Sequence, residues 1–141
     1  MRVDNEKTIF TRIIEGELPC YKLYEDEHVI AILDIQPLTR GHALLIPKEP
    51  APSMDQLSEQ SAAALGESLP KVCRAILKAT GATAYNLIQN NGHEAGMSIA
   101  HVHIHIIPRY PESTHSFVWP YGEIDNTDAA KLAESISDEM D

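Results

Sequence analysis

The chain has 141 residues, of which 43% are apolar and 23% are charged, and this composition is that of one ordinary globular domain. No apolar run approaches the ~18 residues of a membrane-spanning helix, which excludes a transmembrane protein and predicts no membrane partner. The formal net charge of −10 would repel the phosphate backbone of DNA or RNA, so we expect no nucleic-acid partner.

The N-terminus and the cysteines indicate the cellular compartment of the protein. Residues 1–7 have no apolar core and no small-residue cleavage site, so they do not predict a secretory signal. Cys20 and Cys73 are far apart and lack C-x-x-C spacing, which is typical of unpaired thiols. We therefore expect a cytoplasmic protein. Eight acidic residues and one lysine follow Arg109, and we interpret this tail as a solubilising surface.

The first part of the chain predicts one short helix and three strands. Residues 8–15 have apolar side chains at helical spacing, and Gly16 follows as a stop signal. Two β-rich runs, 21–24 and 29–34, are separated by four polar residues and predict a hairpin. A third strand is expected over 42–46, after a loop that contains proline and glycine.

A long helix is predicted over residues 58–80. Ser58 is a suitable N-cap, and Gly81 is a suitable C-terminal stop. Pro70 falls inside this span, where it lacks an amide donor and crowds the preceding turn. We therefore expect either a kink at Pro70 or two abutting helices.

The last part of the chain predicts two strands and a tail. Residues 85–89 read as a strand, 90–96 as a glycine-containing loop, and 99–107 as a last strand that Pro108 ends. The remainder is rich in proline and predicts an extended tail with a short polar helix around 128–137.

Three histidines alternate with apolar residues in the predicted last strand. The histidines are His101, His103 and His105, and the apolar residues are Val102, Ile104 and Ile106. Because side chains alternate across a strand, we expect the three imidazoles on one face and the apolar residues on the other. The remaining loop histidines, His28, His93 and His115, are expected at the surface.

Three interpretations of the histidine row remain open. The outer histidines of a strand would lie ~13 Å apart, so all three cannot bind one metal ion, although an adjacent pair with an outside ligand could. A solvated sheet face is the second interpretation. We favour phosphoryl or nucleotidyl transfer, because a neutral imidazole is a good nucleophile and protonated neighbours would neutralise a phosphate. The middle histidine, His103, is best placed for attack.

A loop just upstream supports anion binding weakly. Residues 90–98 contain glycines for close backbone approach, together with amides and a hydroxyl. Loops with Asn-Gly most often only turn the chain.

Four separated segments together resemble the histidine triad (HIT) family, in its Hint-like branch of nucleotide hydrolases and transferases. They are residues 9–19 (IFTRIIEGELP), 34–42 (DIQPLTRGH), 90–98 (NNGHEAGMS) and the H-x-H-x-H of 101–105. The resemblance covers residues 8–110. It implies an α+β fold with a five-stranded antiparallel sheet, one long kinked helix and short flanking helices. It also implies a single HIT domain over 1–141, with a core at 8–110 and a C-terminal extension at 111–141.

The resemblance also implies the roles of the catalytic residues. By position, His103 is the family nucleophile that forms a covalent nucleotidyl-histidine intermediate, and His101 and His105 orient it and bind the phosphate. His42 matches the family's fourth histidine, and Ser98 matches the hydroxyl beside the α-phosphate and the leaving group.

A homodimer and a purine nucleotide substrate are further implications, with no cofactor and no metal. The implied nucleotide-binding residues are Ile32 and Leu33 at the base, Asp34 at the ribose, Asn90 near the ribose and phosphate, and Gly96, Met97, Ser98, His103 and His105 around the phosphate.

Three features depart from the family pattern or extend beyond it. Met97 stands where glutamine is common, which removes an amide that would contact phosphate. Thr8 and Thr11 occupy positions where some members carry a zinc-binding cysteine pair, and hydroxyls are poor zinc ligands. Trp119 is placed to reach the partner's site in a dimer.

Three functions remain in competition. The first is hydrolysis of purine nucleoside 5′-phosphoramidates or aminoacyl-adenylates to release AMP. The second is hydrolysis of dinucleoside polyphosphates, such as diadenosine tetraphosphate. The third is nucleotide binding with little turnover, which Met97 favours.

Overall fold

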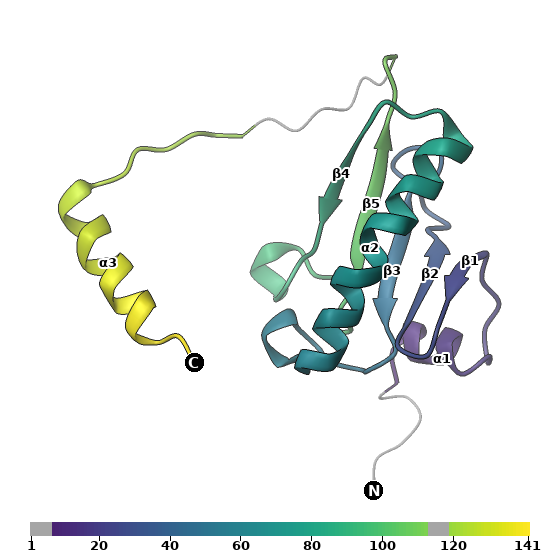
Figure 1. Cartoon of the computed structure of the whole chain (residues 1–141), viewed down its shortest axis with the longest axis horizontal. Helices are drawn as coiled ribbons and strands as arrows, with labels where there is room; N and C mark the ends of the chain where they lie inside the picture. Colours follow the sequence, from purple (N-terminus) through teal and green to yellow (C-terminus); the bar gives the residue numbers. More distant parts are fainter. Residues whose placement is uncertain (1–6, 113–118) are drawn as a thin grey trace, which may run out of the picture.

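A five-stranded antiparallel sheet forms the centre of the molecule, in the order β1-β2-β3-β5-β4 (Figure 1). The computed structural model describes residues 7–112 and 119–141. The strands are β1 Lys22–Glu25, β2 Val29–Leu33, β3 Ala43–Pro47, β4 Ala84–Ile88 and β5 Ile104–Arg109. The predicted α+β class and five-stranded sheet are confirmed. Residues 1–6, on which most of the signal prediction rests, and His115 lie outside the described residues.

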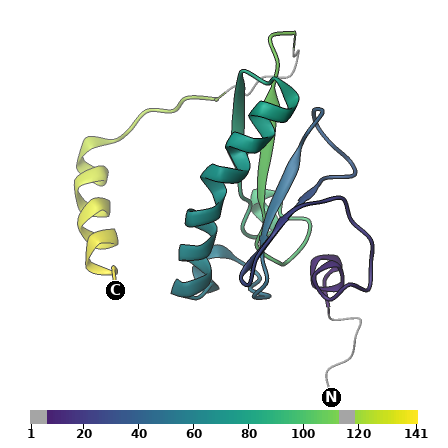
Figure 2. The same cartoon turned by 45° about the vertical axis from the view of Figure 1, so that its right-hand side comes forward.

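The long helix α2, Glu59–Thr80, covers one face of the sheet (Figures 1 and 2). The predicted caps are confirmed: the Ser58 hydroxyl accepts the Ser61 amide at 3.1 Å, and Gly81 has the left-handed φ of 75°. Pro70 lies inside one continuous helix, so the alternative of two abutting helices is wrong. Gly66 and Pro70 are both exposed, so the carbonyl that loses its donor faces solvent.

The short helix α1, Ile9–Ile14, packs on the opposite face of the sheet. Central strands β2 and β3 therefore have apolar side chains on both sides. The cluster beneath α2 includes Val29, Ala31, Ala43 and Leu45, together with Val72 and Ile76 of the helix. The cluster beneath α1 contains Phe10, Ile30, Ile32, Leu44 and Ile46.

Strand β5 differs from its prediction at both ends. It begins at Ile104 rather than at residue 99, because the Val102 amide donates to the Ala51 carbonyl at 2.9 Å instead of to a neighbouring strand. It continues through Pro108 to Arg109. Pairing with β3 stops at Ile106, so the missing amide of Pro108 interrupts no hydrogen bond on that side.

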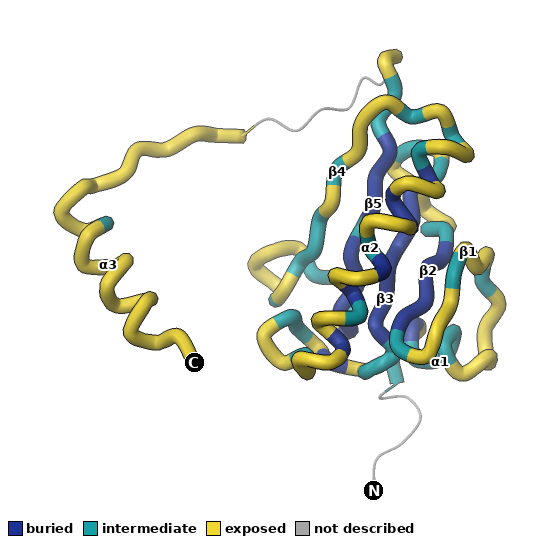
Figure 3. The backbone as a smooth tube through the Cα atoms, viewed as in Figure 1, coloured by how far each residue is buried: buried dark blue, intermediate teal, exposed yellow. Residues whose placement is uncertain are grey.

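The C-terminal arm ends in α3, Asn126–Asp138, close to the predicted polar helix. Asp125 caps it by accepting the amides of Thr127 and Asp128. The helix stands apart from the sheet on the β4 side, and none of its residues is buried (Figures 1 and 3). Within the described residues, no helix has the length and apolarity that crossing a membrane requires.

Candidate active site

A cavity of about 480 Å³ opens on the α1 side of the sheet. Its polar lining residues are Asp34, Gln36, Ser98, His103 and His105. Its apolar wall comes from α1, from residues 18–20 and from the end of β2, with the side chains of Ile9, Phe10, Ile13, Leu18, Pro19, Cys20, Ile32 and Leu33 among them. An apolar slot that ends in a few convergent polar groups is the usual form of a small-molecule site.

A backbone carbonyl orients His103 through its Nδ1 nitrogen. Its Nδ1 lies 2.7 Å from the His101 carbonyl oxygen, and since a carbonyl only accepts, Nδ1 carries a hydrogen. A neutral ring then leaves the Nε2 lone pair unprotonated. The Phe10 ring packs edge-on against the imidazole at a centroid distance of 4.8 Å, and the side chain is buried. This arrangement suits a nucleophile.

His101 lies behind His103 and does not line the cavity. Its Nε2 lies 2.8 Å from the Pro47 carbonyl, which makes Nε2 the protonated nitrogen and Nδ1 an acceptor. The hydroxyls of Thr8 and Thr11 lie 3.3 and 3.4 Å from that Nδ1. Burial lowers the pKa of His101, which favours the neutral ring. All three imidazoles lie on the α1 side of the sheet, where His101 and His103 both contact Phe10 and His103 contacts His105, so the predicted single face is confirmed. His101 and His103 precede β5, however, and do not lie within the strand as predicted.

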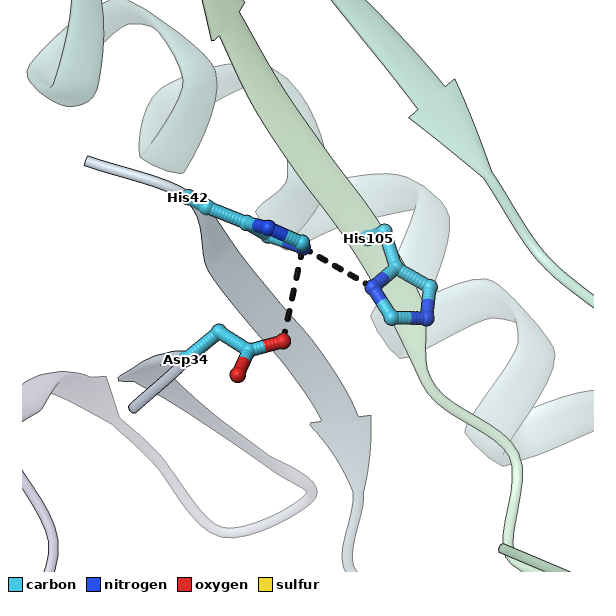
Figure 4. Close-up of side chains that lie close together, drawn as sticks. All are labelled: Asp34, His42 and His105. Carbon is cyan, nitrogen blue, oxygen red and sulfur yellow. Dashed lines mark hydrogen bonds and ion pairs between the residues drawn. The ribbon is translucent and has the colours of Figure 1, made fainter. Parts of the chain in front are cut away.

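A second chain of hydrogen bonds ends at His105. The Leu38 amide donates to His42 Nδ1 at 3.0 Å, so a neutral His42 carries its hydrogen on Nε2. This Nε2 lies 2.9 Å from His105 Nδ1 and 3.5 Å from an Asp34 carboxylate oxygen (Figure 4). His105 Nδ1 therefore accepts, and its Nε2 is a donor in a ring that lines the cavity.

Burial is the main cause that lowers the pKa values of His105 and His42. Desolvation, with smaller effects of the nearby His103 and His42 charges, lowers the pKa of His105 to about 4. Desolvation also lowers the pKa of His42, against the opposing effect of Asp34. A neutral His105 can still donate a hydrogen bond to a phosphate oxygen through Nε2.

Asp34, His42 and His105 also form a group that could be considered as a metal site, since one potential ligand atom of each lies within 4.8 Å of the others (Figure 4). The hydrogen bonds do not fit this use. His42 would have to bind the ion through Nε2, but that nitrogen carries the hydrogen as long as Nδ1 accepts the Leu38 amide. The three side chains therefore fit a hydrogen-bonded chain better than a metal centre. The absence of a metal stays a prediction.

The loop before His101 has a compact fold of its own. A single 3-10 turn, η3 His93–Ala95, lies between Gly92 and Gly96, whose φ angles of 90° and 84° require glycine. The Met97 amide donates to the Gly92 carbonyl at 3.2 Å, which closes the loop just before Ser98 reaches the cavity.

A family model for the HIT domain matches residues 15–112. The chain belongs to the HIT family. It is 43% identical over 133 residues to adenosine 5′-monophosphoramidase hnt1 of Schizosaccharomyces pombe, an alignment that covers 94% of this chain and 97% of that protein. It is 48% identical over 101 residues to adenylylsulfatase HINT3 of Arabidopsis thaliana, where 72% of this chain spans about half, 51%, of the relative.

A solved HIT family protein from Bacillus anthracis has the same fold, with a TM-score of 0.90 and 36% identity. The alignment covers 99% of this chain and all of the relative, so it includes α3. The fold of this HIT protein is thus shared from end to end with a crystal structure.

The structure brings together part of the predicted site. Six of the expected residues line the cavity, namely Ile32, Leu33, Asp34, Ser98, His103 and His105. His42 and His101 stand behind them, as partners of His105 and His103. Asn90, Gly96 and Met97 do not line the cavity, so their contacts with a nucleotide stay predictions.

Sequence reasoning missed the wall that α1 contributes. Phe10 and Ile13 line the cavity, as do Leu18 and Cys20 just after the helix. Phe10, Ile13 and Leu18 lie in the segment 9–19 that carried part of the family resemblance, and Cys20 follows it directly, yet no role was predicted for any of them. The signal that could have found them is the apolar spacing of this short helix, which needs an apolar surface to cover.

Proposed function

We propose that this HIT protein is a nucleotide hydrolase that cleaves purine nucleoside 5′-phosphoramidates or aminoacyl-adenylates and releases AMP. The observation that carries the proposal is the hydrogen bond from His103 Nδ1 to the His101 carbonyl, which leaves Nε2 of a cavity residue free to attack. The relative from Schizosaccharomyces pombe, named as an adenosine 5′-monophosphoramidase over nearly its whole length, supports the same reaction class.

The division of the cavity supports a nucleotide substrate. A purine would lie against the apolar wall of Ile32 and Leu33, and the ribose hydroxyls would bind Asp34. The Asp34 carboxylate already accepts the Gln36 amide at 2.8 Å, which orients it at the mouth of the site. The α-phosphate would then lie between His103, His105 and the Ser98 hydroxyl.

The reaction would proceed in two displacements. In the first, His103 Nε2 forms a bond to the α-phosphorus and the P–N bond breaks, with the amine leaving as it takes up a proton from solvent while His105 Nε2–H donates a hydrogen bond to a phosphate oxygen. In the second, water attacks the phosphorus, the bond to His103 breaks, and the water's proton replaces the one that was lost. The sum is phosphoramidate plus water giving AMP plus amine.

The edge strand β4 supports a homodimer. Tyr85 and Leu87 on this strand are 41% and 46% exposed, and β4 has a neighbour on one side only in the described sheet. An open edge with apolar side chains favours pairing with another strand. We infer that two copies join their β4 edges, and that Trp119, 71% exposed in the arm, is available to the second copy's site. Free thiols at Cys20 and Cys73 fit a cytoplasmic location.

The substrate class is tested by a comparison of rates. Purified protein is given adenosine 5′-phosphoramidate or diadenosine tetraphosphate in the presence of EDTA, and AMP release is followed. The proposal predicts a higher kcat/KM for the phosphoramidate. Preference for the dinucleotide would support the second function, and nucleotide binding without turnover of either compound would support a binding role.

A further inference from the structure

The C-terminal helix α3 has an apolar stripe. Its apolar residues recur at helical spacing as Ala129, Leu132, Ala133 and Ile136. Leu132 and Ile136 are 52% and 57% exposed. A helix with a continuous apolar stripe is normally stabilised by packing that stripe against another surface.

The body of the same chain does not supply that surface. α3 lies beyond β4 and over neither face of its own sheet, as two views of the molecule agree (Figures 1 and 2). The whole helix is unburied apart from partial cover at Ala129 (Figure 3). The alignment with the solved relative from Bacillus anthracis covers 99% of this chain and therefore includes α3.

An apolar groove of about 340 Å³ lies at the opposite end of the sheet, between β1 and α2. Leu23 and Tyr24 form one wall, and Ala75, Ile76 and Ala79 of α2 form the other. Leu23 is 44% exposed. A groove lined by alanines on one side can accept a helix carrying larger apolar side chains.

The charges of α3 and of the α2 wall of the groove are complementary. Lys71, Arg74 and Lys78 are exposed on the second half of α2, which has no acidic residue after Glu67. Lys71 lies 4.4 Å above the centre of the Tyr24 ring, at the rim of the groove. By contrast, α3 carries three acidic residues and one lysine, and Glu139 and Asp141 follow it. Opposite charges on α2 and α3 favour the association of the two helices and influence the orientation in which they pack.

We propose that α3 of one copy packs its apolar stripe into the β1–α2 groove of a second copy. The inference rests on the homodimer proposed above. In a sheet joined through β4, the second copy's β1 lies six strand spacings from β5, or ~29 Å. The 15 residues between Tyr110 and Asn126 can reach up to ~50 Å, so the arm spans that distance. The C-terminal segment of each copy then binds the sheet and α2 of the other copy.

Isotope-filtered NMR on mixed dimers tests the contact. Labelled and unlabelled chains are mixed, and the filter selects contacts between copies. The proposal predicts cross-peaks from the Leu132 and Ile136 methyl groups to those of Ala75 and Ala79. A dimer that lacks these cross-peaks, or cross-peaks arising within one chain, would overturn the proposal. Sedimentation distinguishes failure of the helix contact from failure of the homodimer. A monomer at micromolar concentration would contradict the proposed homodimer itself.

A pair of matched variants tests the energetics. Leu132→Glu places a charge in the stripe, and Ser135→Glu adds the same charge outside it. We expect Leu132→Glu to weaken dimerisation by ~10-fold or more, since burying an unpaired carboxylate is costly, whereas Ser135→Glu leaves the dimer constant within about twofold. Equal effects of the two substitutions would contradict the stripe as the contact.

Discussion

The Nδ1 atom of His103 lies 2.7 Å from the carbonyl oxygen of His101, two residues earlier in the chain. This contact determines which nitrogen of His103 can act as a nucleophile. It also makes the position of His103 depend on how His101 is held. His101 is in turn held by Thr8, Thr11 and Pro47, so the start of α1 and the end of β3 support the reactive ring.

The threonine pair provides a first prediction. In a Thr8→Val/Thr11→Val double variant, the buried Nδ1 of His101 loses both of its donors. An unsatisfied buried acceptor costs about 1–3 kcal/mol, so the free energy of unfolding should fall by that amount in urea titrations. We also expect kcat to fall more than KM changes, because His101 positions the nucleophile through its carbonyl.

The conservative pair Thr8→Ser/Thr11→Ser is the control, since it keeps both hydroxyls. It should restore kcat and the ¹⁵N chemical shifts of His103. If the valine variant loses stability while those shifts and kcat stay unchanged, the threonines stabilise the fold without positioning His103.

A second prediction concerns the chain from Leu38 to His105. His42→Gln can keep a donor near the place of Nε2, whereas His42→Asn can keep only the acceptor for the Leu38 amide. If catalysis depends on the hydrogen-bond donor to His105, the His42→Asn variant should lower kcat by about 10²-fold, and the His42→Gln variant should lower kcat by clearly less. Equal kcat values for the two variants, or a more active His42→Asn variant, would show that the donor to His105 is no more important for catalysis than the acceptor for the Leu38 amide.

The pH dependence of stability is a third prediction. Burial lowers the pKa of His105 to about 4, below the ordinary value of 6.5, and lowers the pKa values of His42 and His101 as well. The unfolded chain therefore binds more protons than the folded protein between pH 6.5 and 4. The free energy of unfolding should fall as the pH decreases through this range.

Urea titrations at several pH values between 7 and 4 would measure this slope. His105→Gln removes one titrating ring, so its slope should be shallower than that of the unsubstituted protein. An unchanged slope would show that His105 does not have a depressed pKa.

Local sequence patterns predicted much of the fold because the relevant interactions are local. The Ser58 cap and the Gly81 stop act within one turn of α2. The alternation over 102–106 also predicted correctly that Val102, Ile104 and Ile106 lie on the face opposite the histidines, and in the structure that face packs beneath α2. The same pattern did not predict where the strand begins. The Val102 amide donates its hydrogen bond to the carbonyl of Ala51, which is far away in sequence, and not to a neighbouring strand.

The same reason explains what was missed in the site. The role of His42 came from the resemblance, but its state depends on a loop amide at Leu38 that no periodic pattern reveals. His101 was expected to bind the phosphate, whereas its two ring nitrogens contact the Pro47 carbonyl and the threonine hydroxyls and its ring does not line the cavity. A non-periodic loop contact decides the case of His42, and contacts between remote segments decide the case of His101.

The most direct test of His103 as the nucleophile is to trap the covalent intermediate. The protein is mixed with adenosine 5′-phosphoramidate in EDTA, quenched within milliseconds and analysed by intact mass and peptide mapping. We predict one adenylyl group per reacted chain, attached to His103, and neither adduct nor AMP release with His103→Ala in a folded protein. An adduct on another residue, or unchanged turnover by His103→Ala, would contradict the account.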